Sequence, residues 1–261
     1  MPISVTDSDM ASSPPLLLLA GWGQSSRFWD RFLPSLEGYQ PVTVDNRETG
    51  SAGPCPEGFT IEDLAGDALA AADREGLGRF TLLGHSMGGF MAQALAFAAP
   101  ERIERLILVS AGPGQPRGIA PDASALTPPP GLELPADPDE AAMAVRAAFY
   151  EMYMAPGGDP PRRQIAVEEA RRAHGNSADL DGLVRQLQAL TSWTPPGDLM
   201  SLGLDVTVVH GDLDPLVPYA NGQIVAELAG VPLTTLTGIG HMVPWEAPNA
   251  LARVIRSPPT G

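Results

Sequence analysis

Short apolar runs alternate with amphipathic stretches along most of the chain. The pattern predicts buried β-strands over residues 16–20, 41–44, 80–83, 105–110, 206–210 and 233–236. Helical periodicity between them predicts helices over 25–36, 60–75, 87–98, 219–229 and 245–256. Pro34 can end the first of these helices early. Strands that alternate with helices form a parallel sheet covered on both faces. We therefore expect an α/β fold with a mostly parallel sheet of about six strands.

The alternation stops after residue 111 and resumes near residue 201. The intervening segment begins rich in Gly, Pro, Asp and Ala, and then shows helical patterns over 139–154, 161–174 and 179–192. Ligands of α/β sheets bind at the carboxyl ends of the strands, where such an insertion can cover them. We predict a core domain of residues 15–111 and 201–261 with a helical cap, or lid, of residues 112–200.

Composition narrows the possible partners. The net charge of −15 disfavours nucleic acid and anionic membranes. No apolar run is long enough to span a bilayer, so we expect a cytoplasmic protein without a membrane partner. The chain has no lysine, which excludes Schiff-base chemistry, and the single Cys55 and four histidines show no metal-ligand spacing. We expect no metal and no cofactor; a monomer and a homodimer remain open.

The segment Gly84-His85-Ser86-Met87-Gly88 is the strongest chemical signal. It joins the predicted strand 80–83 to the predicted helix 87–98, with the serine at the turn. Such a nucleophile elbow exposes a serine hydroxyl at the carboxyl end of a sheet, and its glycines let strand and helix approach closely. The N–H of Met87, at the start of the helix, can bind an oxyanion. The segment predicts covalent acyl chemistry at Ser86.

Two later loops supply an acid and a base. Asp214 follows the strand 206–210, and His241 lies in a glycine-flanked loop after the strand 233–236. An acid just past a strand end is well placed to orient a histidine. The order Ser86, Asp214, His241 is the one expected for this elbow.

These three motifs together resemble the α/β-hydrolase superfamily, in particular its cap-bearing serine members, which include esterases, lactonases and haloperoxidases. The resemblance implies that Ser86 is the nucleophile, His241 the general base and Asp214 the residue that orients it. It favours Asp214 over Asp212, because the superfamily motif places the acid three residues after a glycine. It also implies that the backbone N–H groups of Trp22 and Met87 form the oxyanion hole.

The chain departs from the superfamily at three places. Ala20-Gly21 stands where a His-Gly pair is usual, and Glu48 replaces a glycine in the loop after the second strand. The superfamily's N-terminal antiparallel hairpin has no room before Leu16, so we expect it to be reduced or absent.

The remaining singled-out side chains have structural interpretations. We expect His85 to pack under the turn, His210 to bond to backbone, His174 to lie on the surface, and Arg47 to form an ion pair. The aromatic and methionine side chains of the cap suit a small to medium apolar substrate, although for each single residue packing onto the core is the favoured interpretation. The pocket candidates are Trp22, Phe149, Tyr150, Tyr153, Trp193 and Met242.

The expected reaction is hydrolysis of an ester, lactone or thioester through an acyl-enzyme. Three alternatives stay open: a carbon–carbon bond hydrolase or cofactor-free perhydrolase or haloperoxidase on the same triad; a cofactor-free cyclase, oxygenase or isomerase that uses His241 as base; and a ligand receptor without catalysis. The fold alone does not decide among them.

Overall fold

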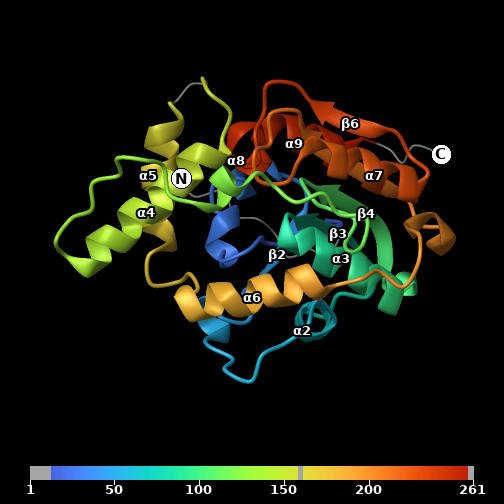
Figure 1. The fold of residues 1–261 in the computed structure, drawn as a ribbon. Helices are drawn as coiled ribbons and strands as arrows, with labels where there is room; N and C mark the ends of the chain where they lie inside the picture. The colour runs from blue at the N-terminus through green and yellow to red at the C-terminus, as the bar shows by residue number, and fades with distance from the viewer. Residues whose placement is uncertain (1–12, 158–160, 258–261) are drawn as a thin grey trace, which may run out of the picture.

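A six-stranded parallel sheet forms the centre of the molecule (Figure 1). The computed structural model describes residues 13–157 and 161–257. The strands lie in the order β2-β1-β3-β4-β5-β6, and each neighbouring pair is parallel. Their bounds are β1 Pro15–Leu19, β2 Gln40–Val44, β3 Phe80–His85, β4 Ile103–Val109, β5 Val206–Gly211 and β6 Leu233–Leu236. The predicted fold class and strand number are confirmed.

Alternate residues of β1 face two separate hydrophobic clusters. Leu17 and Leu19 pack in one cluster with side chains of α2, α3 and α7. Leu16 and Leu18 pack in the other with α9 and the 3-10 segment after β1. All four leucines are fully buried, because successive side chains of a strand point to opposite faces and both faces are covered here.

The core helices follow the predicted pattern with two corrections. They are α2 Ile61–Arg74, α3 Met87–Ala98, α7 Tyr219–Ala229, α8 Val243–Glu246 and α9 Pro248–Arg256. The single helix predicted over 25–36 is wrong: it is two 3-10 turns, Ser26–Trp29 and Leu33–Ser35, because Pro34 cannot continue an α-helix. The helix predicted over 245–256 divides at Ala247, whose φ of −136° and ψ of 49° are not helical; a following proline such as Pro248 disfavours helical backbone at this position.

The segment between β4 and β5 is helical, as its pattern indicated. It contains the α-helices α4 Pro138–Tyr153, α5 Arg162–Ala173 and α6 Leu180–Ser192, with 3-10 turns at Ala123–Leu126 and Leu199–Leu202. Figure 1 shows α4 and α5 together on one side of the molecule, with α6 set apart from them. Buried side chains of α4 and α5 join the cluster of Leu16, whereas Ala189 of α6 joins the cluster of Leu17.

Two further findings concern the described residues as a whole. None of their helices is both long and apolar enough to cross a membrane. Within the same ranges, no group of three or more His, Cys, Asp or Glu side chains is placed to hold a metal ion. The residues before Ser13, where the N-terminal hairpin was expected to be reduced or absent, lie outside the described residues.

Candidate active site

Ser86 lies in a strained turn between β3 and α3. Its φ of 56° and ψ of −122° are unusual for a residue with a Cβ, and the residue is 7% exposed. The flanking glycines make this turn sterically possible. A Cβ at Gly84 would collide with the carbonyl of Gly88, and one at Gly88 with the carbonyl of Leu19. Strand, turn and helix therefore meet as the elbow pattern predicts.

The loop after β1, residues 20–24, lies directly against Ser86. A Cβ at Gly21 would stand 3.0 Å from the Cβ of Ser86 and 3.4 Å from its Oγ. The N–H of Gly21 donates to Gln24 Oε1 at 3.2 Å, and the N–H of Gly23 donates to Gln186 Oε1 at 2.7 Å. Trp22, a predicted oxyanion donor, stands between these two bonded amides. We call residues 20–24 the oxyanion loop.

Met87, the other predicted donor residue, is the first residue of α3 and is fully buried. Helix N-termini carry N–H groups without an intrahelical partner and a favourable dipole for negative charge. The local structure can therefore stabilise an oxyanion beside Ser86.

Asp214 and His241 are in direct contact. His241 Nδ1 lies 2.8 Å from Asp214 Oδ2, and both side chains are buried. The other carboxylate oxygen, Oδ1, accepts the N–H groups of Leu216 at 2.9 Å and Val217 at 2.8 Å. These contacts hold the carboxylate at a single orientation toward the imidazole.

Electrostatics keep Asp214 ionised. Burial alone would raise the pKa of its carboxyl group, but the neighbouring His241 and hydrogen bonds from His210 and His241 outweigh burial and lower that pKa. Asp212, the alternative acid, instead accepts the N–H of Gly238 at 2.6 Å. Of the two carboxylates, Asp214 is the one that contacts His241.

The other two histidines near the site have buried structural contacts. His210 Nε2 lies 2.9 Å from the carbonyl of Val217, the backbone bond that was predicted, and 3.3 Å from Asp214 Oδ2. His85 is fully buried and stacks on Phe28 with ring centroids 4.8 Å apart. Burial, and then the proximity of His241, lowers the pKa of His85 to about 3, so this ring is neutral.

The loop that carries His241 is tied to the end of α4. The N–H of His241 donates to the carbonyl of Tyr153 at 2.7 Å. The Glu246 carboxylate accepts N–H groups from Gly240 at 3.1 Å, Met242 at 3.1 Å and Ala155 at 2.7 Å. Sequence reasoning missed Glu246, although its place five residues after His241 was visible.

A cavity of about 300 Å³ reaches Ser86. Its walls come from the oxyanion loop, the start of α3, the segment after β4, α6, and the segment from the end of β5 to the start of α7. None of its lining residues is charged. The lining side chains are mostly apolar; they include Trp22, Met87, Phe90, Ile119, Pro121, Leu126, Leu187, Leu190, Leu216 and Val217. A hollow of about 470 Å³ between Arg31, Arg162 and Glu246 is larger, but Ser86 does not line it.

Of the six predicted pocket residues, Trp22 lines this cavity and the other five do not. Tyr150 packs edge-on against Trp245 at 4.9 Å, and the Tyr153 hydroxyl donates to the carbonyl of Ala125 at 3.1 Å. Phe149 packs beside Tyr153, Met242 is buried in the same cluster, and Trp193 lies behind Phe90 with rings 5.6 Å apart.

The reason for this difference is the position of the insertion helices. The aromatic face of α4 packs onto the second hydrophobic cluster, and α6 supplies the cavity wall instead. The leucines of α6 were visible as an amphipathic pattern, but that pattern does not say which surface its apolar face covers.

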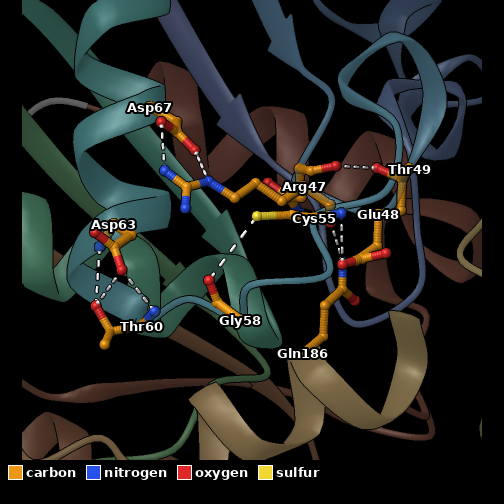
Figure 2. Close-up of polar contacts among 10 residues, drawn as sticks. Arg47, Glu48, Thr49, Cys55, Gly58, Thr60, Asp63, Asp67 and Gln186 are labelled. Atoms are coloured by element: carbon orange, nitrogen blue, oxygen red, sulfur yellow. Dashed lines mark hydrogen bonds and ion pairs between the residues drawn. The ribbon is translucent and has the colours of Figure 1, made fainter. Parts of the chain in front are cut away.

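Arg47 and His174 lie where they were predicted. Arg47 pairs with Asp67 through Nε at 2.6 Å and a second nitrogen at 3.1 Å (Figure 2). The hydrogen bonds to Asp67 raise the pKa of the Arg47 guanidinium. Burial alone would lower that pKa. His174 is exposed at the end of α5.

Comparison with known proteins places the chain in a family. A protein from Agrobacterium fabrum (strain C58) named "Putative carbamate hydrolase RutD" is 30% identical over 236 residues, which are 87% of this chain and 84% of that protein. A protein of the same name from Klebsiella pneumoniae subsp. pneumoniae is 33% identical over 112 residues, 42% of each chain. Among solved structures, the enol-lactonase from Burkholderia xenovorans LB400 has a TM-score of 0.74 and 22% identity, covering 93% of this chain and 90% of that one.

The likeness to that structure shows the fold, whereas a family model spans nearly the whole chain. The model described as "Alpha/beta hydrolase family" matches residues 16–254. The chain is therefore an enzyme that belongs to the alpha/beta hydrolase family.

Proposed function

We propose that this protein is a serine hydrolase that cleaves an uncharged ester, lactone or thioester of small to medium size. The observation that carries the proposal is the cavity of about 300 Å³, uncharged and mostly apolar in its lining, which opens onto Ser86. Pockets of this kind bind apolar groups and exclude charged ones, which would lose hydration without a partner. The hydrogen-bonded pair of Asp214 and His241 supplies the base that such a nucleophile needs.

The proposed reaction uses each group at a stated atom. Asp214 Oδ2 accepts the Nδ1–H of His241, which leaves Nε2 free to take a proton. His241 Nε2 takes the Ser86 hydroxyl proton as Oγ attacks the substrate carbonyl carbon. The N–H groups of Trp22 and Met87 stabilise the resulting oxyanion.

Collapse of this intermediate breaks the bond to the leaving group, which receives the proton from His241. Water then attacks the acyl-enzyme with His241 again as base, and the acid product leaves with Ser86 regenerated.

A second candidate is hydrolysis of a carbamate. The similar proteins from Agrobacterium fabrum and Klebsiella pneumoniae carry that activity in their names, and the same three side chains could attack a carbamoyl carbon. The apolar lining of the cavity favours a substrate with hydrocarbon to bury, so the ester class is preferred.

A panel of p-nitrophenyl esters of rising chain length, with small lactones, thioesters and carbamates, tests the proposal. The wild type should hydrolyse short to medium esters and label with a fluorophosphonate probe. Ser86→Ala should lose roughly 10⁴-fold or more in kcat and should not label. A wild type that turns over carbamates alone would select the second candidate, and one that hydrolyses no member of the panel would contradict both.

A further inference from the structure

Side-chain contacts hold helix α6 against the loops that follow β1 and β2. Arg185 forms a two-pronged ion pair with Glu48, with Nε to Oε1 at 2.7 Å and a second nitrogen to Oε2 at 2.9 Å. Gln186 donates to the carbonyl of Arg47 at 2.8 Å and accepts the N–H of Gly23 at 2.7 Å. We call these contacts of Arg185 and Gln186 the α6 clamp; Figure 2 shows Gln186 and the loop after β2.

Gln186 is the central residue of the clamp. Its side chain is fully buried, and both ends of the amide are hydrogen-bonded to backbone. A buried amide costs free energy unless its donors and acceptors are paired. Here the pairing links two loops that follow neighbouring strands, β1 and β2, and one of them is the oxyanion loop.

Glu48 holds the helix from the loop after β2. Glu48 is 7% exposed, and its φ is 78°. A positive φ is unfavourable for any residue with a Cβ. The hydrogen bonds from Arg185 are the largest cause that lowers the pKa of the Glu48 carboxyl group, whereas burial alone would raise it. The N–H of Cys55 also donates to Oε1 at 3.0 Å. The ion pair thus compensates the strain that a glycine here would avoid.

A second contact joins α6 to the oxyanion loop. The indole Nε1 of Trp22 donates to the carbonyl of Leu183 at 2.8 Å. Trp22 and Gly23 are therefore both hydrogen-bonded to one helix turn, and Gly21 at the other end of the loop packs on Ser86. The position of the Trp22 backbone relative to Ser86 depends on where α6 sits.

The same helix also forms part of the cavity wall through Leu187, Leu190 and Thr191. One rigid element thus touches the space where substrate binds and the loop that faces its carbonyl oxygen. Misplacing such a donor by about 1 Å can cost on the order of 100-fold in rate.

We propose that Gln186 is a positioning residue, which holds the backbone N–H of Trp22 in line with the oxyanion formed at Ser86. The inference rests on the proposed hydrolase function and goes beyond it. Gln186 does not touch the substrate; it acts by hydrogen-bonding Gly23 and tying the oxyanion loop to the loop after β2.

The test compares Gln186→Met with Gln188→Met. Gln188 lies on the same helix and is exposed, so it reports the effect of the substitution itself. With a p-nitrophenyl ester, Gln186→Met should lower kcat by roughly 10- to 100-fold and change KM by less than about threefold. Gln188→Met should match the wild type in both constants.

Inhibitors separate a positioning role from general loosening. A trifluoromethyl ketone adds to Ser86 and forms an oxyanion, so its affinity should fall in Gln186→Met by about the same factor as kcat/KM. The affinity for the ether analogue of the ester, which has no carbonyl oxygen to accept the N–H of Trp22, should change little. Gln186→Glu retains an oxygen that can accept the Gly23 N–H, and its kcat should lie between those of the wild type and Gln186→Met.

Three results would overturn the inference alone: unchanged kcat in a folded Gln186→Met protein, an equal loss of affinity for the ketone and for the ether analogue, or equal defects in the Gln186→Glu and Gln186→Met variants. A wild type without Ser86-dependent hydrolysis would instead contradict the proposed function. Amide hydrogen exchange at Gly23 would then still decide whether Gln186 holds the loop: faster exchange in Gln186→Met supports the tether, and unchanged exchange refutes it.

Discussion

The nucleophile elbow and the α6 clamp both place groups beside Ser86, but by different physical means. In the elbow, backbone meets backbone: Gly84 faces the carbonyl of Gly88, and Gly88 faces that of Leu19. In the clamp, side-chain amide and ion-pair contacts reach across 163 residues of sequence, as between Gly23 and Gln186. Steric exclusion allows little adjustment, whereas polar side chains can be exchanged one at a time.

This difference predicts how the two regions tolerate change. The elbow should fail as a unit when a methyl group is added, because no flexible side chain is present to yield. The clamp should lose function gradually, since each hydrogen bond contributes about 1 kcal/mol and the helix retains its apolar packing. Three experiments follow. The first tests Asp214, the acid predicted to act with Ser86, and the other two test the contrast between the elbow and the clamp.

The largest effect is expected at the strand-end acid. Asp214→Asn should lower kcat by roughly 10⁴-fold, because an amide in place of the carboxylate favours the wrong imidazole tautomer. The matched change Asp212→Asn should leave kcat within about twofold, since Asp212 bonds Gly238 and not His241. Ester hydrolysis by the two purified variants measures this, and a larger loss in Asp212→Asn would reverse the assignment.

A smaller effect is expected from adding one methyl group to each region. Gly88→Ala should destabilise the fold by about 1 to 3 kcal/mol, because its walls are the backbone of Leu19 and Ala20. In Gly182→Ala on α6, the added Cβ would lie 2.9 Å from the Glu48 side chain. The gain in helix propensity of about 1 kcal/mol should offset that crowding, so the free energy of unfolding should change less than in Gly88→Ala. Urea unfolding of both variants gives the comparison; equal losses would remove the proposed contrast.

The smallest effect is expected at the ion pair of the clamp. Glu48→Gln should cost about 1 to 2 kcal/mol of unfolding free energy at pH 7, since a charge-assisted pair becomes a neutral one. The pKa of Glu48 is lowered on folding, so this contribution is complete above the unfolded value of about 4.3. It disappears as the pH falls through the lower folded value.

Urea unfolding at a series of pH values from 7 downward measures this difference. The exposed residue Glu104 provides the control, and Glu104→Gln should change stability by less than about 0.5 kcal/mol. A difference between wild type and Glu48→Gln that stays constant into acid would show that the charge of Glu48 contributes nothing to the clamp.

Much of the core was predictable from local pattern. The strand ranges, the helix expected over 60–75 and the strand-turn-helix around Ser86 all depend on residues close in sequence. In the structure that helix, α2, begins at a capping box formed by Thr60 and Asp63. The helix expected over 25–36 was wrong for a local reason as well. Pro34 has no backbone N–H to donate within an α-helix, and the apolar periodicity around it does not show this.

Prediction of the pocket was less successful for a reason that is not local. The sequence pattern of the aromatic face of α4 is the same whether that face lines a ligand pocket or packs on a core. In the structure it packs on the core, where Tyr150 contacts Trp245. The leucines of α6 gave no sequence signal for a pocket either, yet Leu187 and Leu190 line the cavity.

The sequence by itself determined the alternation of strands and helices, the turn that exposes Ser86, and the loops that carry Asp214 and His241. These features follow from side-chain periodicity and glycine sterics within a few residues. Only the tertiary structure decided which insertion helix closes the cavity, why a buried Glu48 stands at a positive φ, and that Gln186 joins two strand-end loops. Those outcomes depend on pairing between segments more than a hundred residues apart, where several partners would satisfy the same apolar or polar pattern equally well.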